Sequence, residues 1–564
     1  MEKRALVAVI LSLLVLVLWQ KFYIAPRQEA WRKQQQKVSE DLVKPSPVPE
    51  GSDKQGVSSP SLSQQALLSQ VIPQPVNAEA KEILVESKLM RIILTTQGAR
   101  IKSWKILKHK DAKGDPVELV SELSSQVNRY PLEVLTESTP LNTELNFGLF
   151  TASKSALYLD ESNKTDSIEF TYKNQDGFSF TKTLTFYKDN YQVDVALALH
   201  NPPQEVHSAF LTWGPGLGGT LLDDQTTYDN AIVSAAHGKV IRQSVSKLKE
   251  VIHADNVNWS AIDRKYFAVA LLPASISNTV AMELLPTGEA PQDKKVVSVD
   301  QIILKVGQSG LDSANYRVYA GPKEYDKLSA LKAGLEQLID YGYYLGWLVK
   351  AMVLFMGVIY EYTHNYGVAI IALTVLVKLI FYPLTYQSFK SMKGMQALQP
   401  KMTEIREKYR KDPKLMNQKL MELYKKEGIN PMGGCLPMLL QIPVFFALYQ
   451  ALLVSIELRG ASFLWIPDLS APEPYKIKVL VLLMGVSMFV QQSMTPTTGD
   501  PKQAQMFKFM PIIFTAMFWN FPAGLVLYWL VNNVLSIGQQ YLINRGDATG
   551  KRAVSGKKKK VTKG

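Results

Sequence analysis

The sequence predicts a multi-domain membrane protein, in which an N-terminal anchor helix and a large all-β domain precede an α-helical membrane core of five spans. Three observations lead to this prediction. Long apolar segments are confined to the N-terminus and to residues 345–543, strand-like segments fill residues 81–322, and Lys and Arg gather between the C-terminal apolar segments. With 564 residues and a net charge of +13, the chain is too long for one domain.

The first 24 residues predict a transmembrane signal anchor. The basic start MEKR precedes an apolar run from Ala5 to Trp19, which is the arrangement of an export signal. No small-residue cleavage site follows, so we expect the segment to stay uncleaved, with a cleaved signal as the alternative. Residues 25–80 are rich in Gln, Ser, Pro, Lys and Glu and have too little apolar surface to fold, which predicts a disordered linker.

Residues 81–322 predict an antiparallel β domain. Segments such as FSFTKTLTFY and YQVDVALALH are rich in β-branched and aromatic residues and are separated by Asn, Gly, Asp and Pro turns. The glycine-rich residues 214–219 lack a following Gly-Lys-Ser/Thr, so they predict a turn and not a phosphate-binding loop.

Residues 323–364 change to a helical pattern. In the stretch YYLGWLVKAMVLFMGVIYEYTH, Lys350 and Glu361 flank an apolar stripe that has aromatic residues at both ends. This pattern predicts amphipathic helices that lie in the membrane interface. A span over residues 343–360 is the alternative.

The membrane core is expected over residues 365–545, and its first span, residues 367–384, contains one cation, Lys378. Eighteen residues make about 27 Å of helix, close to the thickness of the hydrocarbon layer. Thr374 lies four residues before Lys378, so both share one helical face, and a polar face in lipid normally points to a protein interior or a wet cavity. Alternatively, Lys378 extends toward the headgroups near Pro383.

A strongly basic segment, residues 386–430, follows this span. Its excess of Lys and Arg marks the cytoplasmic side. Apolar residues at helical spacing on both sides of Asp412-Pro413 predict a helical hairpin. The charges fit either a solvated cytoplasmic face or a docking surface for RNA or protein.

Four more apolar segments complete the core, at about 433–456, 477–494, 508–521 and 524–543, and a basic tail follows at 546–564. The basic segments alternate with basic-poor ones, which predicts cytoplasmic N- and C-termini and residues 25–345 on the opposite side.

Polar side chains recur in these spans. Gln441 lies one turn before Phe445, and Gln491 and Gln492 lie near the end of the third core span. The last span carries four such residues on neighbouring turns: Trp529, Asn532, Asn533 and Ser536. Two interpretations remain open: hydrogen bonds between helices, or a shared wet groove. The segment 508–521, at about 20 Å short for a bilayer, favours the groove.

Composition argues against cysteine and zinc chemistry. Cys435 is the single cysteine, which excludes an internal disulfide, and the six histidines are scattered without metal-ligand spacing. We therefore expect no metal and no cofactor.

Four stretches carry a resemblance to a known family: KLIFYPLT at 378–385, NPMGGCLPMLLQIPVFFALYQAL at 430–452, ELRGASFLWIPDLS at 457–470 and FPAGLVLYWLVNN at 521–533. They resemble the YidC/Oxa/Alb family, in particular the YidC membrane protein insertases of Gram-negative bacteria. The resemblance implies a non-enzymatic insertase and chaperone, which inserts nascent integral membrane proteins into the inner membrane, alone or with the Sec translocon.

The resemblance also implies roles for individual residues. A hydrophilic groove would be lined by Lys378, Thr374, Gln441, Asn532 and Asn533, with lysine at a position where the best-known relatives carry arginine. Substrate helices would slide along Phe445, Tyr528 and Trp529. The β domain would be a periplasmic β-supersandwich similar in shape to sugar-mutarotase folds.

Further partners follow from charge. The basic tail and the hairpin are expected to contact the ribosome, including ribosomal RNA, or anionic lipids. Two other function classes stay open: a small-solute transporter or channel, although we find no inverted repeat in 367–543, and a membrane-anchored periplasmic carbohydrate-binding or scaffold protein.

Overall fold

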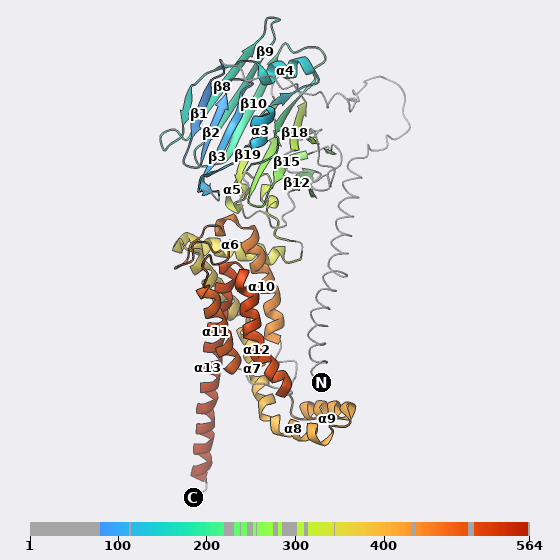
Figure 1. Cartoon of the computed structure of the whole chain (residues 1–564), viewed down its shortest axis with the longest axis vertical. Coiled ribbons are helices and arrows are strands. Elements are labelled where there is room, and N and C mark those ends of the chain that lie inside the picture. The colour runs from blue at the N-terminus through green and yellow to red at the C-terminus, as the bar shows by residue number, and fades with distance from the viewer. Residues whose placement is uncertain are drawn as a thin grey trace, which may run out of the picture. The chain divides into compact units, whose positions relative to one another are not determined.

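The computed structural model describes residues 79–111, 114–218, 231–236, 239–244, 252–254, 257–274, 280–284, 302–309, 314–342, 344–429, 436–494 and 501–561. The predicted anchor, residues 1–24, and the predicted linker up to residue 78 lie outside these ranges. The described chain forms a β-rich unit that ends at Ile339 and a helical unit that begins at Asp340. Figure 1 shows the elements of both units.

The β-rich unit contains three sheets. The first has the order β4 (Pro116–Glu118), β3 (Arg100–Lys110), β2 (Met90–Thr95), β1 (Glu82–Glu86), β7 (Ala156–Tyr158). The second has the order β13 (Lys239–Ser244), β12 (Ala231–Ala236), β15 (Val257–Asp263), β16 (Phe267–Pro273), β19 (Ala314–Pro322), β10 (Gln192–His200), β9 (Ser179–Tyr187), β8 (Thr165–Lys173), β6 (Thr151–Ala152). The third has the order β14 (Ile252–Ala254), β17 (Val280–Leu284), β18 (Ile302–Ser309), β11 (Ser208–Trp213), β5 (Val134–Leu135).

Alternation of apolar and polar residues builds these sheets as the sequence predicts. In β9 and β10 every second side chain is buried, and Leu184 lies opposite Val195 in the antiparallel register. The predicted antiparallel pairing is confirmed, with β1 and β7 as a parallel exception. The glycine-rich residues 214–218 follow β11 as an irregular turn, in which the Gly216 N–H donates to the Ile302 carbonyl.

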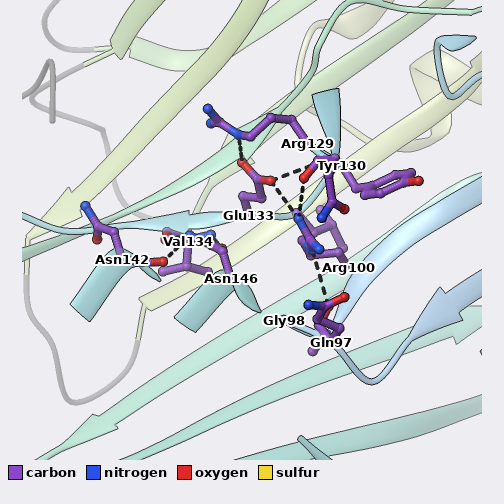
Figure 2. A network of polar contacts seen from close by, with 12 residues as sticks. Gln97, Gly98, Arg100, Arg129, Tyr130, Glu133, Val134, Asn142 and Asn146 are labelled. Atoms are coloured by element: carbon purple, nitrogen blue, oxygen red, sulfur yellow. Dashed lines mark hydrogen bonds and ion pairs between the residues drawn. The ribbon is translucent and has the colours of Figure 1, made fainter. Parts of the chain in front are cut away.

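Two asparagines close one edge of the third sheet. Helix α4 (Thr139–Phe147) presents Asn142 and Asn146 to edge strand β5 (Figure 2). Asn146 accepts from the Val134 N–H at 2.9 Å and donates to the Val134 carbonyl at 2.8 Å, and Asn142 brackets Thr136 in the same way. These side-chain amides take the hydrogen bonds that a further strand would make.

The β-rich unit extends past residue 322, where the sequence analysis ended the β domain. Helix α5 (Tyr325–Ala330) and the 3-10 helix η5 (Leu335–Leu338) fold onto the strands, because Leu328, Leu335 and Leu338 are fully buried. Arg242 of β13 also donates to the carbonyls of Gln337 and Leu338. The first part of the predicted interfacial segment, residues 323–339, therefore belongs to the β-rich unit. A further short helix, α3 (Glu122–Val127), precedes β5.

The helical unit is built from α6 (Gly346–Thr363), α7 (Tyr366–Ala397), α10 (Leu436–Val454), α11 (Val479–Met494), α12 (Pro501–Met517) and α13 (Ala523–Val561). The 3-10 helix η7 (Ile456–Leu458) follows α10, and η8 (Phe518–Asn520) continues α12. The predicted apolar segments match α10, α11, α12 with η8, and the start of α13. Two helices run longer than predicted: α7 continues through Pro383, and α13 continues through most of the predicted tail.

Contacts fix the directions of the bundled helices. α7 and α13 run parallel, because Lys378 contacts Ser536 and, further along both helices, Lys393 contacts Ile543. α10 and α13 run antiparallel. Gly524, near the start of α13, lies beside Leu452 near the end of α10, and Tyr528, one turn further along α13, contacts Gln441 near the start of α10. The basic hairpin and the C-terminal end of α13 consequently lie at the same end of the bundle (Figure 1).

The predicted hairpin is confirmed as α8 (Gln399–Lys408) and α9 (Pro413–Lys426). Asp412 caps α9, because its carboxylate accepts from the N–H groups of Lys414 and Leu415 at 3.1 Å. A small apolar cluster holds the two helices together, formed by Met395, Leu398, Met402 and Leu420 with Ile405, Met416, Leu423, Tyr424 and Ile429 around them.

Hydropathy and length single out α7 within the described chain as long and apolar enough to cross a membrane. Shorter apolar helices cover Leu440–Val454, Val479–Met494 and Phe509–Asn520. α6 packs on α7 and α10 and buries Val349, Met352 and Met356, whereas Trp347 and Tyr362 are exposed on it. This amphipathic distribution agrees with the predicted interfacial helix, whose position in a membrane stays a prediction.

Candidate functional site

The last helix of the bundle, α13, divides into an apolar and a polar part. Its first turns bury Leu525, Val526, Leu527 and Tyr528, and the following turns bury polar side chains at positions that face the same bundle: Asn532, Asn533, Ser536 and Gln540. The interior of the helical unit is therefore apolar beside the first turns of α13 and polar beside the following turns. The two layers described next, one polar and one aromatic, lie along this helix.

The polar layer consists of Lys378, Ser487, Asn532, Asn533 and Ser536. The ammonium of Lys378 on α7 donates to the Ser536 hydroxyl at 2.7 Å, and the Asn533 amide donates to the Ser487 hydroxyl of α11 at 2.9 Å. α13 is thus tied to α7 on one side and to α11 on the other by polar contacts. Three of these five residues, Lys378, Asn532 and Asn533, were predicted as groove residues, and Ser536 was predicted as a polar position of the last span; Ser487 was not predicted.

Lys378 is half-buried in this layer. Its ammonium carries three hydrogens, and in the described part of the chain one acceptor, the neutral Ser536 hydroxyl, takes a hydrogen bond from it. No described carboxylate lies within ion-pair distance of Lys378. The layer therefore holds a cation without a counter-charge from the described residues.

Thr374 shares the buried side of α7 with Lys378, as predicted, but it is turned to its own helix. Its side chain is fully buried, and its hydroxyl donates to the Ile370 carbonyl at 2.7 Å. The single hydroxyl hydrogen is used by the backbone, so Thr374 offers acceptor capacity only.

Gln441 and Tyr528 form a pair between α10 and α13, in which the Gln441 amide donates to the Tyr528 hydroxyl. Tyr528 has 1% exposed surface. The resemblance implied a sliding surface at Tyr528; its ring instead lies in the interior of the bundle, because it follows the buried face of α13.

The aromatic layer consists of Phe445, Phe514, Phe518, Phe521 and Trp529. Phe518 lies at its centre with 1% exposure, and its ring centroid is 5.9 Å from Phe445, 4.9 Å from Phe521 and 5.3 Å from Trp529. Phe445 and Trp529, which the sequence analysis brought together, meet edge to face at 5.4 Å and are both half-buried. Phe514 and Phe518 were not predicted from the sequence.

Signals for the missed residues exist in the sequence. Ser487 is the single hydroxyl in the run VLVLLMGVSMFV, where an isolated polar group needs a partner. Phe514 and Phe518 are four residues apart and therefore share a helical face. Neither signal names the partner helix, which only the packing of the bundle determines.

The two layers differ in the contacts that they can make. Among the described residues no group of three or more His, Cys, Asp and Glu side chains could hold a metal ion. A cation, amides and hydroxyls beside a cluster of aromatic rings can receive polar and apolar polypeptide segments in turn.

A second polar cluster lies in the β-rich unit (Figure 2). Glu133 accepts from Arg100 at 3.0 Å and from Arg129 at 2.5 Å, and the Tyr130 N–H donates to it at 3.2 Å. Arg100 and Glu133 are each 1% exposed. Each charge has its partners inside the fold, so this cluster is structural.

Comparison with known proteins identifies the family. Residues 82–355 match the model of the YidC periplasmic domain, and residues 358–551 match that of the 60Kd inner membrane protein. The membrane protein insertase YidC of Geotalea uraniireducens is 38% identical, covering 97% of this chain and 99% of that protein, and its counterpart from Syntrophus aciditrophicus is 37% identical, covering 97% and 100%.

A crystal structure of an active YidC insertase with its first transmembrane domain resolved is 20% identical, covers 84% of this chain and 96% of that one, and gives a TM-score of 0.37. The relatives are named for inserting membrane proteins, which is not an enzymatic activity. The two matched models together span both units of the structure. The chain therefore belongs to the YidC family of membrane protein insertases.

Proposed function

We propose that this insertase of the inner membrane receives the polar tail of a nascent membrane protein at the polar layer and releases the adjoining apolar helix sideways into lipid. The residues in named roles are Lys378, Asn532, Asn533, Thr374 and Gln441 for the polar tail, and Phe445 and Trp529 for the apolar helix. The proposal extends the family assignment to a mechanism carried by particular side chains.

The observation that carries the proposal is that Lys378 is half-buried and has no described counter-charge. A half-buried ammonium with one neutral partner among the described residues retains most of its capacity to attract an anion. Polar or acidic groups cost several kcal/mol to place in hydrocarbon. A cation and amides within the bundle lower this cost for the time of crossing.

Release into lipid needs no energy source beyond burial. Apolar surface that leaves water gains roughly 25 cal/mol per Å², and Phe445 and Trp529 are half-buried at the edge of the aromatic layer. Contacts with a passing apolar helix there stay weak, so the helix continues into the membrane. No nucleotide and no cofactor has a role in this mechanism.

The proposed membrane topology has an anchor at residues 1–24 and five core spans. The spans are formed by α7, α10, α11, α12 with η8, and α13. Both termini lie in the cytoplasm and residues 25–345 in the periplasm. The common position of the basic hairpin and the C-terminal end of α13 at one end of the bundle supports this orientation.

Partners follow the same orientation. The basic α8–α9 hairpin and the basic residues 546–564 are proposed to contact the ribosome or anionic lipids, and the family resemblance alone supports cooperation with the Sec translocon. Cosedimentation of the chain with ribosomes, with and without residues 546–564, tests the tail. Unchanged cosedimentation removes the tail from the proposal.

The mechanism is tested by changing the charge at residue 378. Two matched single-span substrates, one with an acidic translocated tail and one in which Asn replaces each acid, are inserted into proteoliposomes containing the full chain. We expect Lys378→Ala to impair the acidic substrate selectively and Lys378→Arg to retain insertion. Lys390→Ala, which removes an exposed lysine of the same helix, is the control. Full insertion of the acidic substrate by Lys378→Ala contradicts the proposal.

A further inference from the structure

The hydroxyl of Ser536 connects Lys378 to the backbone of α13. It donates to the Asn532 carbonyl at 2.7 Å, and the Lys378 ammonium donates to it at 2.7 Å. A hydroxyl has one hydrogen and two acceptor lone pairs. Because the hydrogen is used by Asn532, Ser536 faces Lys378 as an acceptor with a fixed direction.

Ser536 is 4% exposed, so this geometry is set within the bundle and not by solvent. A serine buried in an apolar helix usually satisfies itself on its own backbone, which Ser536 also does. Its remaining acceptor capacity is what Lys378 uses. The contact is therefore an addition to the ordinary behaviour of a buried serine.

Without this acceptor, the Lys378 side chain could extend in another direction. The next residues of α7, Leu379 and Ile380, are 65% and 62% exposed and present an apolar surface. A long lysine side chain beside such a surface extends toward the nearest polar environment. An acceptor on α13 keeps the ammonium on the inner side of α7.

We infer that Ser536 is a positioning residue, which holds the Lys378 ammonium toward α13 and leaves its other two hydrogens for the carboxylates of a substrate. The inference rests on the proposed role of Lys378. It goes further in assigning the orientation of the cation to one hydroxyl on another helix and in making acidic-tail selectivity depend on that hydroxyl.

The test uses an isosteric pair of variants, Ser536→Thr and Ser536→Val, in the full chain. Threonine keeps a γ-hydroxyl that can bond to the Asn532 carbonyl, and valine has the same shape without it. We expect Ser536→Val to slow insertion of the acidic-tail substrate about tenfold, the usual weight of a hydrogen bond to a charged group. Ser536→Thr should match the unaltered chain, and the neutral-tail substrate should be unaffected by either change.

A double-mutant cycle separates positioning from packing. If Ser536 acts through Lys378, Ser536→Val has no further effect in a chain that already carries Lys378→Ala. As an independent readout, Lys378 in purified Ser536→Val should react faster with a water-soluble acetylating reagent, measured by mass spectrometry of the peptide, because the hydrogen bond no longer holds its nitrogen.

The results distinguish the inference from the proposed function. Equal losses for acidic and neutral substrates, an undiminished effect of Ser536→Val beside Lys378→Ala, or an unchanged acetylation rate overturns the positioning role while the proposed function stands. If Lys378→Ala itself has no effect on acidic substrates, the proposed function fails, and the acetylation rate still decides whether Ser536 holds Lys378.

Discussion

Lys182 in the β-rich unit and Lys378 in the helical unit both lie inside their unit, but the number of hydrogen bonds that their ammonium groups donate differs. Lys182 of β9 is fully buried and donates to three backbone carbonyls, those of Gly98 at 3.1 Å, Ala99 at 3.0 Å and Leu132 at 2.8 Å. Lys378 of α7 is half-buried and donates to one side-chain hydroxyl among the described residues. The first ammonium is saturated by the fold, and the second is left with spare hydrogens.

The difference lies in the acceptors that surround the two ammonium groups. Around Lys182 the acceptors are backbone atoms that cannot leave without unfolding, and burial, followed by the charge of Arg100, lowers its pKa to about 7. Around Lys378 the acceptor is a single hydroxyl, which a substrate can complement. In the proposed function, the two ammonium hydrogens of Lys378 without a described acceptor are the donors that bind the substrate.

The largest expected effect concerns Lys182 and pH. An unfolded lysine has a pKa near 10.5 and the folded Lys182 about 7, so between pH 7 and 10 the unfolded chain binds a proton that the folded chain does not. The free energy of unfolding of the β-rich unit should therefore rise with pH in this window, by up to about 5 kcal/mol. Below pH 7 both states are protonated and this contribution no longer changes.

Hydrogen exchange of the β strands in the full chain at pH 7 and above, corrected for intrinsic rates, measures this slope. Lys182→Met should flatten it, whereas Lys173→Met, which removes an exposed lysine of β8, should not. Equal slopes for the unaltered chain and Lys182→Met would contradict the assignment.

The ion pair beside Lys182 gives the next effect. Glu133→Gln leaves the buried Arg100 without its counter-charge, and removal of one partner of a buried pair typically costs about 3–5 kcal/mol. Urea unfolding followed by a probe in the β-rich unit measures the loss. Glu82→Gln is the matched control, because its ion pair with Lys102 lies at the surface, with the Glu82 side chain 55% exposed, and should contribute less than about 1 kcal/mol. Similar losses for both variants would refute a structural role of the cluster.

In the helical unit the aromatic layer, and not the polar layer, should carry stability. Phe518→Ala removes the central ring and is expected to cost about 3 kcal/mol, the lower range for a buried phenylalanine. Phe446→Ala, at a 54% exposed position of α10, should cost much less. Thermal unfolding in one detergent compares the two. A Phe518→Ala chain as stable as Phe446→Ala would show that the rings do not hold the bundle.

The smallest effect is expected in the polar layer. Asn533→Ala breaks the hydrogen bond to Ser487, and such bonds between membrane helices contribute about 0.6 kcal/mol on average. Thermal unfolding should hardly distinguish it from Val534→Ala at the neighbouring exposed position. A loss of stability as large as that of Phe518→Ala would mean that hydrogen bonds of the polar layer hold the helices together.

Much of the fold follows from local patterns. The alternation in β9 and β10, the apolar lengths of α10 and α11, and the Asp412-Pro413 cap were all predictable, because each depends on residues close in the sequence. The ends of the elements were less so. Residues 323–339 join the β-rich unit through leucines that are buried in it and through Arg242, far away in sequence, which donates to the carbonyls of Gln337 and Leu338. No local pattern contains these contacts.

The site was predictable in its residue types and not in its pairings. A lysine in an apolar span is a candidate site residue from the sequence alone, and so are two consecutive asparagines in the last span. That Lys378 meets Ser536 depends on the parallel packing of α7 and α13, and the interior position of Tyr528 depends on which face of α13 is buried. These are properties of the assembled bundle.

The most direct test of the spare capacity of Lys378 is a zero-length crosslink. A carbodiimide joins a lysine amine to a carboxylate only when the two are in contact, so an insertion intermediate with an acidic tail can be treated and its crosslinked peptides sequenced by mass spectrometry. The account predicts an amide bond between Lys378 and an acidic residue of the tail, absent when the tail carries Asn. Tail crosslinks confined to surface lysines such as Lys390, with none at Lys378, would contradict it.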